Sequence, residues 1–296
     1  MRISLVSNGQ LLTPERPDGA VPWWSFTKTV LCAAALSLVR DELIGLDDRV
    51  PEGPFTLRQL LGHRAGLADY GELADYHAAV GRGEAPWSAD DMLRRLDASS
   101  LRYPPGSQWR YSNVGYLFVA RLLERLTGLP LQRALERCVL APLGSRARLA
   151  TTPEDLWGED RASVAAYAPG WVYHGLLTGT LSDAALLLDR LLGGSLLPHT
   201  LLEEMQRALV LGGPIPGRPW AAPGYGLGLM IGVTKGGLTL RGHTGSGPGS
   251  VVAVYRCVRG GQSASCAVFS EGEDQGAVEA EALAHLARAL ERKEVD

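Results

Sequence analysis

The amino-acid sequence predicts an α+β fold. Both ends of the chain are expected to form one antiparallel sheet flanked by helices, with a mostly helical subdomain inserted between them. Three observations lead to this prediction. Alternating, strand-like segments occur near the N-terminus and again after residue 224. The long stretch between them has mainly helical patterns, and a further helical pattern closes the chain.

The N-terminal segment predicts a hairpin followed by a buried helix. Residues Arg2 to Val6 alternate in polarity and end at Asn8-Gly9, a dipeptide typical of tight hairpin turns. We expect a second short strand before Pro14. From Ser25 to Arg40 the pattern is helical and apolar on nearly every side, which is typical of a helix buried inside a protein.

The middle of the chain, from Thr56 to about Leu211, is predicted to be mostly helical. A capping box at Thr56-Leu57-Arg58-Gln59 indicates the start of one short helix. The other predicted helices are Ser88–Leu96 with Ser88 as its N-cap, Val114–Leu126 ended by Gly128 and Pro130, Leu131–Val139, and Leu181–Leu192.

Strand patterns return after Gly224, with glycine pairs as turns. Gly236-Gly237 and Gly260-Gly261 are the turn candidates, and a helix from Gln275 to Arg292 is expected to end the chain. The predicted strands are Tyr225–Val233, Leu238–Thr244, Ser250–Val258 and Ser263–Ser270.

These elements divide the chain into two interleaved parts. Residues 1–52 and 215–296 are expected to form the sheet subdomain, and residues 53–214 the helical subdomain. A cleft between two such parts is a common place for a small-molecule site, so we expect the active site there.

The composition excludes several classes of function. The 296 residues include 29 Lys+Arg and 32 Asp+Glu, and this near balance excludes a general nucleic-acid binder. Apolar residues make up 46% and charged residues 21%, which excludes a largely disordered chain. The longest apolar run, Val30 to Val39, is too short to span a membrane. The first residues contain too short an apolar run for a signal peptide, so we expect a cytoplasmic protein.

The four cysteines do not have the spacing of a zinc site, and no metal or cofactor is predicted. Cys32 and Cys138 lie in helical apolar patterns and are expected to be buried thiols. Cys257 and Cys266 flank a glycine turn, so they could face each other across a hairpin. In a cytosolic protein we expect them to remain thiols as well.

Ser25 and Lys28 form the first candidate constellation. Residues three apart on a helix share a face, so the two side chains can touch. A serine becomes a nucleophile when a base removes its proton, and a lysine with a lowered pKa can be that base. Lys28 is one of only three lysines, with Lys235 and Lys293, and it lies in an otherwise apolar helix. The alternative is a helix-capping serine followed by a surface lysine.

Tyr111-Ser112-Asn113 is the second constellation, and it follows a Pro-Pro-Gly loop and precedes a helix. A tyrosine near a cation can act as a general base, and an asparagine amide can both donate to and accept from a substrate. The alternative is a helix-capping asparagine beside a packed aromatic ring.

His243-Thr244-Gly245-Ser246 is the third constellation, at the end of a predicted strand. A glycine within a strand permits close approach of a ligand backbone, and an exposed strand edge can pair with an extended amide. The histidine could donate to a substrate carboxylate or carbonyl. The alternative is a glycine-rich turn with an incidental histidine.

Together, the three constellations resemble the serine penicillin-recognising family, which includes class C β-lactamases, DD-peptidases, and related esterases and D-aminopeptidases. Their order matches the family motifs SxxK, YxN and [KH]TG. Further similar segments are Leu60–Leu67, Ala141-Pro142-Leu143-Gly144 and Tyr225-Gly226-Leu227-Gly228. The resemblance covers nearly the whole chain and implies a β-lactamase/transpeptidase-like fold.

The resemblance also implies roles for individual residues. Ser25 would be the acylated nucleophile, and Lys28 and Tyr111 would exchange its proton and pass one to the leaving group. The N–H groups of Ser25 and Ser246 would form the oxyanion hole. Water would then hydrolyse the acyl-enzyme.

Substrate binding is implied for Asn113 and for the strand residues His243, Thr244, Gly245 and Ser246. Asn113 would hold the acyl amide, which favours amide substrates over simple esters. His243 stands where dedicated β-lactamases have a lysine. A neutral imidazole attracts a carboxylate less than an ammonium does, so strong β-lactamase activity is not expected.

The sequence thus predicts a serine hydrolase that cleaves a small amide or ester through a Ser25 acyl-enzyme. A carboxylesterase or acyltransferase on the same scaffold is one alternative, and a catalytically silent binding protein of the family is another. The expected partner is a small-molecule substrate, without nucleic acid or membrane, and the oligomeric state is left open.

A few other residues are less informative. His63 is expected to pack structurally, and Trp23 and Trp24 either line the cleft or belong to the core. Tyr173 and His174 could lie at the rim of the site, but we assign them no role.

Overall fold

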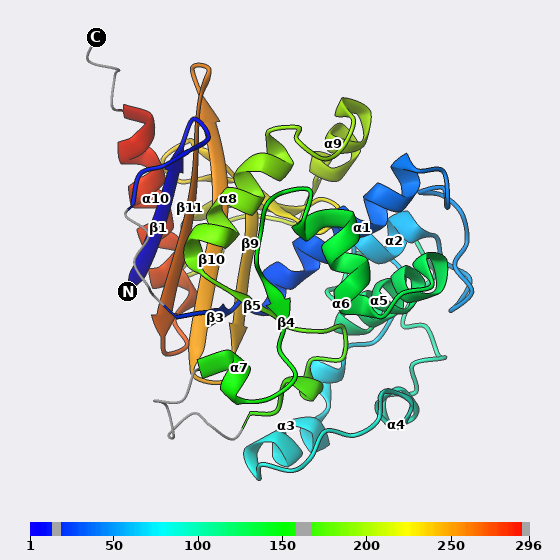
Figure 1. Ribbon diagram of the computed structural model, residues 1–296. Coiled ribbons are helices and arrows are strands. Elements are labelled where there is room, and N and C mark those ends of the chain that lie inside the picture. The colour runs from blue at the N-terminus through cyan, green and yellow to red at the C-terminus, as the bar shows by residue number, and fades with distance from the viewer. Residues whose placement is uncertain (14–18, 158–166, 292–296) are drawn as a thin grey trace.

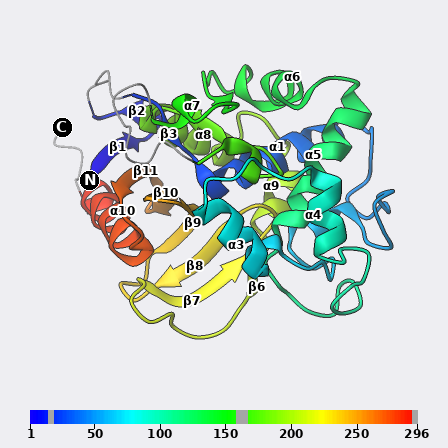
Figure 2. The ribbon, with the colours of Figure 1, turned by 90° about the horizontal axis from the view of Figure 1, so that it is seen from below.

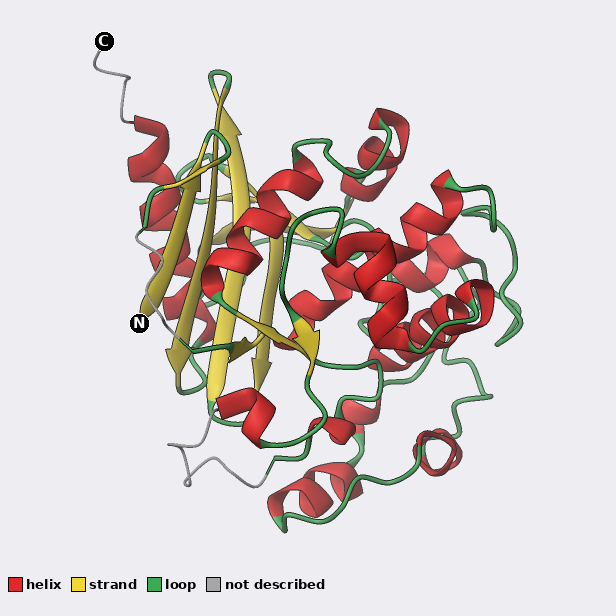
Figure 3. Ribbon diagram, in the orientation of Figure 1, coloured by secondary structure: helices red, strands yellow, loops and turns green. Residues whose placement is uncertain are grey.

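An eight-stranded antiparallel sheet forms one side of the molecule in the computed structural model, which describes residues 1–13, 19–157 and 167–291 (Figure 1). Figure 3 shows most helices gathered on the other side. The strand order is β2-β1-β11-β10-β9-β8-β7-β6. The strands are β1 (Arg2–Ser7), β2 (Gln10–Leu11), β6 (Leu209–Val210), β7 (Trp220–Tyr225), β8 (Met230–Thr234), β9 (Thr239–Gly247), β10 (Ser250–Arg259) and β11 (Gln262–Glu271).

The two ends of the chain meet inside this sheet, as predicted. β1 pairs with β11 from Arg2 opposite Phe269 to Ser7 opposite Ala264. Asn8 and Gly9 have φ of 46° and 80°, the backbone conformation that a two-residue hairpin turn requires. This turn leads into β2, so the second short strand expected before Pro14 is present.

Helices cover both faces of the sheet. α10 (Gln275–Glu291) packs on one face of β10 and β11, and α8 (Leu181–Leu192) packs on the other (Figures 1 and 2). Alternate residues of a strand point to opposite faces. α8 belongs to the segment 53–214 by sequence, yet it lies against the sheet. The division into 1–52 with 215–296 and 53–214 therefore stays a proposal.

The predicted buried helix is α1 (Thr27–Arg40), and its residues from Thr27 to Leu38 are all buried. A short 3-10 turn, η1 (Trp24–Phe26), precedes it, so Ser25 lies just before the α-helix and not in its first turn. α1 contacts α5 (Asn113–Thr127) on the helical side, while η1 contacts β9 and β10 of the sheet. The helix therefore links the two parts of the fold.

The middle of the chain is mostly helical, as predicted. The Thr56 capping box, the Ser88 N-cap and the left-handed Gly128 after α5 are all present. Leu131–Val139 is helical, but its second half is a π-helical turn, η3 (Glu136–Leu140). The remaining elements of this part are α2 (Leu57–Leu61), η2 (Tyr70–Glu72), α3 (Ala74–Gly81), α4 (Ala89–Arg95), α6 (Leu131–Leu135), α7 (Glu154–Trp157), η4 (Pro169–Trp171) and α9 (His199–Gln206).

A second, three-stranded sheet was not predicted. It has the order β3-β5-β4 and joins the segment before Ser25 to the middle of the chain. Strands of two or three residues are too short to produce a recognisable pattern in the sequence. They are β3 (Val21–Pro22), β4 (Arg148–Leu149) and β5 (Leu177–Gly179).

The prediction of one strand over Tyr225–Val233 is wrong, because this stretch contains the end of β7 and most of β8. The chain turns between them at Gly228, whose φ is +64°. A Cβ at this position would overlap the Cys32 side chain of α1, so only glycine fits here. The prediction failed because the turn is packed against the core, so its residues are as apolar as those of the strands on either side.

The other C-terminal predictions agree with the structure in kind. β9, β10 and β11 follow the predicted strands, and both glycine pairs form turns. The last helix is described to Glu291, so Arg292 lies outside the described residues. All four cysteines are buried free thiols, and Cys257 opposes Ala264 and not Cys266. Within the described ranges, no helix combines the length and apolar character that a membrane span requires.

Candidate active site

Ser25 lies at the centre of the strained turn η1. Trp24 has φ of 42°, a left-handed value that costs a residue with a side chain on the order of 1 kcal/mol. The surroundings hold Trp24 in this conformation: its ring is buried, and its Nε1 donates a hydrogen bond of 2.9 Å to Ser250 Oγ on β10. The turn presents the half-buried Ser25 in front of α1.

Strand β9 approaches this turn closely because it has glycines there. A Cβ on Gly245 would lie 2.5 Å from the Ser25 backbone nitrogen and 2.6 Å from Trp24 Cβ. A Cβ on Gly247 would overlap the Trp24 ring. We expected glycine in this strand to admit a ligand backbone. In the structure it admits the protein's own serine turn.

Two predicted residues, Lys28 and Tyr111, meet at Ser25. Lys28 Nζ lies 3.3 Å from Ser25 Oγ, and the Tyr111 hydroxyl donates a hydrogen bond of 2.9 Å to the same oxygen. Lys28 is completely buried, and its Nζ lies 5.1 Å from the centre of the Tyr111 ring. The serine oxygen is thus contacted by an amine and by a phenol.

Burial changes the acid–base behaviour of both neighbours. Desolvation lowers the pKa of Lys28 to about 7, although the Asp69 carboxylate opposes this shift. Desolvation raises the pKa of Tyr111 well above its usual value near 10, although the hydrogen bond to Ser25 opposes that shift. At neutral pH a free amine is therefore available at Lys28, whereas Tyr111 is a phenol. The arrangement supplies a base and a hydrogen-bond donor at one oxygen.

Asn113 is fixed by a carboxylate that sequence reasoning missed. Its Nδ2 donates to Asp69 Oδ1 at 3.0 Å, and its backbone N–H donates to the same oxygen at 3.0 Å. With its amide nitrogen held in this way, Asn113 keeps its side-chain carbonyl for other partners. Asp69 lies two residues after Leu67, the end of the family-like segment, and this position is the signal that could have found it.

A directed chain of hydrogen bonds connects the second and third constellations. The Ser112 N–H donates to His63 Nδ1 at 3.2 Å, so His63 Nε2 carries the ring proton and donates to the Tyr225 hydroxyl at 3.1 Å. Tyr225 then donates to His243 Nε2 at 3.1 Å. His243 Nδ1 donates to the Thr244 carbonyl at 2.7 Å. The two ends of the chain fix the direction of every bond between them.

The two histidines in this series of hydrogen bonds, His63 and His243, are neutral. Burial, together with the nearby Lys28, lowers the pKa of His63 well below its usual value and that of His243 to about 3. His63 packs structurally, as predicted. Both ring nitrogens of His243 are bonded to the protein, and its ring is not part of the cavity lining. The structure therefore does not bring His243 into the position expected for a contact with a substrate carboxylate.

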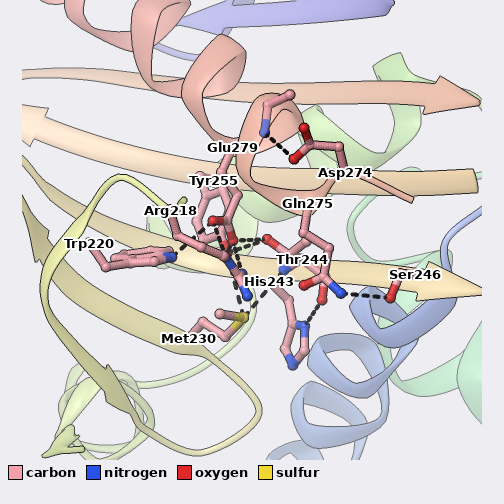
Figure 4. A network of polar contacts seen from close by, with 11 residues as sticks. Arg218, Trp220, Met230, His243, Thr244, Ser246, Tyr255, Asp274, Gln275 and Glu279 are labelled. Carbon is pink, nitrogen blue, oxygen red and sulfur yellow. Dashed lines mark hydrogen bonds and ion pairs between the residues drawn. The ribbon is translucent and has the colours of Figure 1, made fainter. Parts of the chain in front are cut away.

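Thr244 is turned away from the cavity toward α10 (Figure 4). Its hydroxyl donates to the carboxylate of Glu279, which is completely buried. The same carboxylate accepts from the Arg218 guanidinium and from Trp220 Nε1, the latter at 3.0 Å. Thr244 thus fastens β9 to the C-terminal helix. Ser246, two residues further along, accepts a hydrogen bond of 2.9 Å from Gln275 Nε2.

A cavity of about 230 Å³ opens in front of Ser25. Of the predicted site residues, Ser25, Asn113 and Ser246 line it, while Lys28 and Tyr111 lie behind Ser25. The rest of the lining is largely aromatic and comes from η1, η2, α3, the segments on both sides of η4, and the end of β9 with the turn after it. These residues are Trp24, Tyr70, Gly71, Tyr76, His77, Val80, Tyr167, Val172, His174, Gly247 and Pro248.

His174 is a second residue that sequence reasoning left without a role. Its Nε2 lies 3.1 Å from Lys28 Nζ, and its side chain is buried at the edge of the cavity. The two residues are 146 positions apart, so no spacing rule could have joined them.

Comparison with known proteins gives matches over most of the chain. A family model described as Beta-lactamase matches residues 3–289. A D-aminopeptidase from Brucella anthropi is 28% identical over 263 residues, which are 83% of this chain and 48% of that protein. The chain therefore spans about half the length of the curated relatives it matches.

Solved structures match over nearly the whole chain. A D-stereospecific amidohydrolase from Streptomyces sp. has a TM-score of 0.77 and 25% identity, covering 94% of this chain and 93% of its own. A D-amino acid amidase from Ochrobactrum anthropi SV3 has a TM-score of 0.76 and 22% identity, covering 97% and 92%. These matches confirm the predicted α+β fold.

The lowered pKa of Lys28 predicts a pH dependence for the reactivity of Ser25. Lys28 is an ammonium below about pH 7 and a free amine above it, so the rate of Ser25 modification by a fluorophosphonate should rise through about pH 7 and then level off. Labelling reactions that are quenched at set times and analysed by intact-mass measurement give this profile. A rate that falls or stays constant between pH 6 and 8 would contradict the role of Lys28 as the base.

The buried carboxylate of Glu279 predicts a large stability effect. Glu279→Gln leaves the Arg218 guanidinium without its counter-charge inside the protein, which costs about 3–5 kcal/mol in the free energy of unfolding. Glu281→Gln on the same helix removes a partly exposed pair with His285 and should cost less than about 1 kcal/mol. Urea unfolding of both variants tests this, and equal midpoints would refute it.

Proposed function

The chain belongs to the beta-lactamase family, and we propose that it is a serine hydrolase that cleaves a small amide through an acyl-enzyme at Ser25. The observation that carries this proposal is the meeting of Lys28 Nζ and the Tyr111 hydroxyl at Ser25 Oγ, next to a cavity. An activated serine needs a base within hydrogen-bond reach, and the buried amine of Lys28 meets that need.

Acylation starts with proton transfer from Ser25 Oγ to the free amine of Lys28. The oxygen attacks the substrate carbonyl carbon, and the N–H groups of Ser25 and Ser246 stabilise the negative oxygen that forms. The Tyr111 hydroxyl then gives its proton to the leaving nitrogen. It takes a proton in return from the Lys28 ammonium, which becomes a free amine again. The C–N bond breaks and the acyl-enzyme remains.

Water completes the reaction. It loses a proton to the base formed by Lys28 and Tyr111 and attacks the Ser25 ester, and the same two N–H groups stabilise the second tetrahedral intermediate. The Ser25 oxygen leaves with a proton from this base, and the carboxylic acid product departs. No step requires a group other than these side chains, backbone N–H groups and water.

The substrate class is supported by the lining of the cavity and by the relatives. The Asn113 carbonyl is suited to accept a substrate N–H because Asp69 occupies its amide nitrogen. The aromatic side chains Trp24, Tyr70 and Tyr76 favour an apolar or aromatic acyl group. The names of the relatives, a D-aminopeptidase and a D-stereospecific amidohydrolase, favour a D-configured amide. We therefore propose D-amino acid amides with an apolar side chain as substrates.

A panel of substrates tests this proposal. D-Phenylalanine amide should be hydrolysed at least about 10-fold more efficiently than its L-enantiomer. When the substrate carbonyl lies in the oxyanion hole, only one enantiomer places its side chain against Trp24, Tyr70 and Tyr76. A p-nitrophenyl ester and a chromogenic cephalosporin serve as comparisons. Faster turnover of the ester with no amide cleavage would assign a carboxylesterase instead, and the absence of turnover with all of them would favour a binding protein.

Ser25→Ala should lower hydrolysis of the best substrate of the panel by more than about 1000-fold, because the acyl-enzyme cannot form. Intact-mass measurement of the quenched wild-type reaction should show the mass of the acyl group, and the variant should not. Ser100→Ala, which changes an exposed serine, is the matched control and should behave as wild type. Retained hydrolysis in Ser25→Ala would refute Ser25 as the nucleophile.

A further inference from the structure

The loop that carries His174 is fastened to the serine turn. β5, which follows this loop, pairs with β3, so that Val21 opposes Gly179 and Pro22 opposes Thr178. Leu177 accepts a hydrogen bond of 2.8 Å from the N–H of Trp23. Its own N–H donates to the Thr27 hydroxyl of α1 at 3.0 Å. The unpredicted three-stranded sheet therefore fixes His174 relative to Ser25 and Lys28.

Lys28 Nζ lies between two polar atoms of the described residues. One is Ser25 Oγ at 3.3 Å, and the other is His174 Nε2 at 3.1 Å. The faces of Tyr111 and Tyr116 lie beside the amine, with ring centres 5.1 and 5.8 Å away. Ring faces attract an ammonium but do not fix the direction of its N–H bonds. His174 is therefore the acceptor that can orient the amine.

The protonation state of His174 follows from its surroundings. Burial lowers its pKa well below the usual value, and the positive charge of Lys28 lowers it further, so the ring is neutral. An ammonium at Lys28 can only donate, so in that state Nε2 accepts and the ring proton lies on Nδ1. The free amine also has N–H bonds, so it can keep the same hydrogen bond after it loses a proton. Nδ1 is buried and has no hydrogen-bond partner among the described residues.

We propose that His174 is a positioning residue that aims the free amine of Lys28 at Ser25. By accepting one N–H of Lys28, the ring turns the nitrogen so that its single lone pair faces Ser25 Oγ. Without this acceptor, the four-carbon side chain can rotate its lone pair toward the tyrosine faces, where no proton is available. The inference rests on the proposed function, because it concerns the base of that reaction.

The charged and titratable groups near Lys28 come from several elements of the fold. The Asp69 carboxylate favours the ammonium, whereas burial disfavours it. The neutral His174 favours the ammonium through its hydrogen bond. The groups that contact Lys28 or interact with its charge are His63, Asp69, Tyr111, Tyr116, His174 and His243.

The scarcity of lysine permits a direct test. Labelling with [6-13C]lysine gives three signals, for Lys28, Lys235 and Lys293, and Lys28→Arg assigns the first. In His174→Leu the ammonium loses an acceptor inside an apolar site, so the pKa of Lys28 should fall by about 1 unit or more. In His174→Gln, whose side-chain oxygen can replace Nε2, the pKa of Lys28 should stay within about 0.5 unit of wild type.

The same variants are compared in kcat/KM with the best substrate. His174→Leu should lower kcat/KM by about 10-fold or more, and the acid limb of its pH profile should follow the Lys28 titration. His174→Gln should recover most of the loss. A Lys28 titration that is unchanged in His174→Leu, or a glutamine variant no better than leucine, would overturn the proposal.

A measurement on the wild-type protein keeps the proposal testable even if His174→Leu does not fold. Histidine nitrogen NMR, assigned with His174→Gln, should show the neutral ring with its proton on Nδ1. A proton on Nε2 would refute the proposal, because that nitrogen could not accept from Lys28. These NMR titrations need no turnover, so failure of the proposed function and failure of the His174 inference give separate results.

Discussion

The burial of one lysine amine is the constraint on which the rest of the site depends. An ammonium without water costs several kcal/mol, and the protein reduces this cost by lowering the pKa of Lys28 to about 7 and by surrounding the nitrogen with suitable partners. Those partners come from separate elements: Ser25 from the turn before α1, the ring face of Tyr111 from the loop before α5, and His174 from the loop before β5. Each of these loops must therefore be held in place by its own contacts.

Strand β9 provides much of that support through the alternation of its side chains. Gly245 lies against the serine turn, while Thr244 and Ser246 face the C-terminal helix and bond to it. A shift of one residue in the register would put a side chain where only glycine fits. The Glu279 carboxylate accepts hydrogen bonds from Thr244, Arg218 and Trp220. A shift in the register would break the bond to Thr244, so this network favours the observed register.

The sequence was informative where short-range rules apply. Helical spacing joined Ser25 to Lys28, and Gly128 located the end of α5, the helix that starts at Asn113. The motif order then indicated that Tyr111 belongs with them. His174 and Asp69 were missed because their contacts span 146 and 44 residues, and no local pattern encodes such distances. A strand was also predicted up to Thr244, but which of its faces turns toward the cavity depends on the whole sheet, so the placement of His243 could not be derived.

The sheet order has a consequence for the synthesis of this protein. Trp24, which precedes Ser25, donates a hydrogen bond to Ser250, which is 226 positions later in the chain, and β1 has no neighbour on one side until β11 is made. A ribosome-bound chain therefore carries Ser25 and Lys28 long before β9 and the C-terminal helix exist. The candidate site can assemble only after β9 and α10 have been made, so the nascent polypeptide cannot act on substrate before these elements have joined the fold.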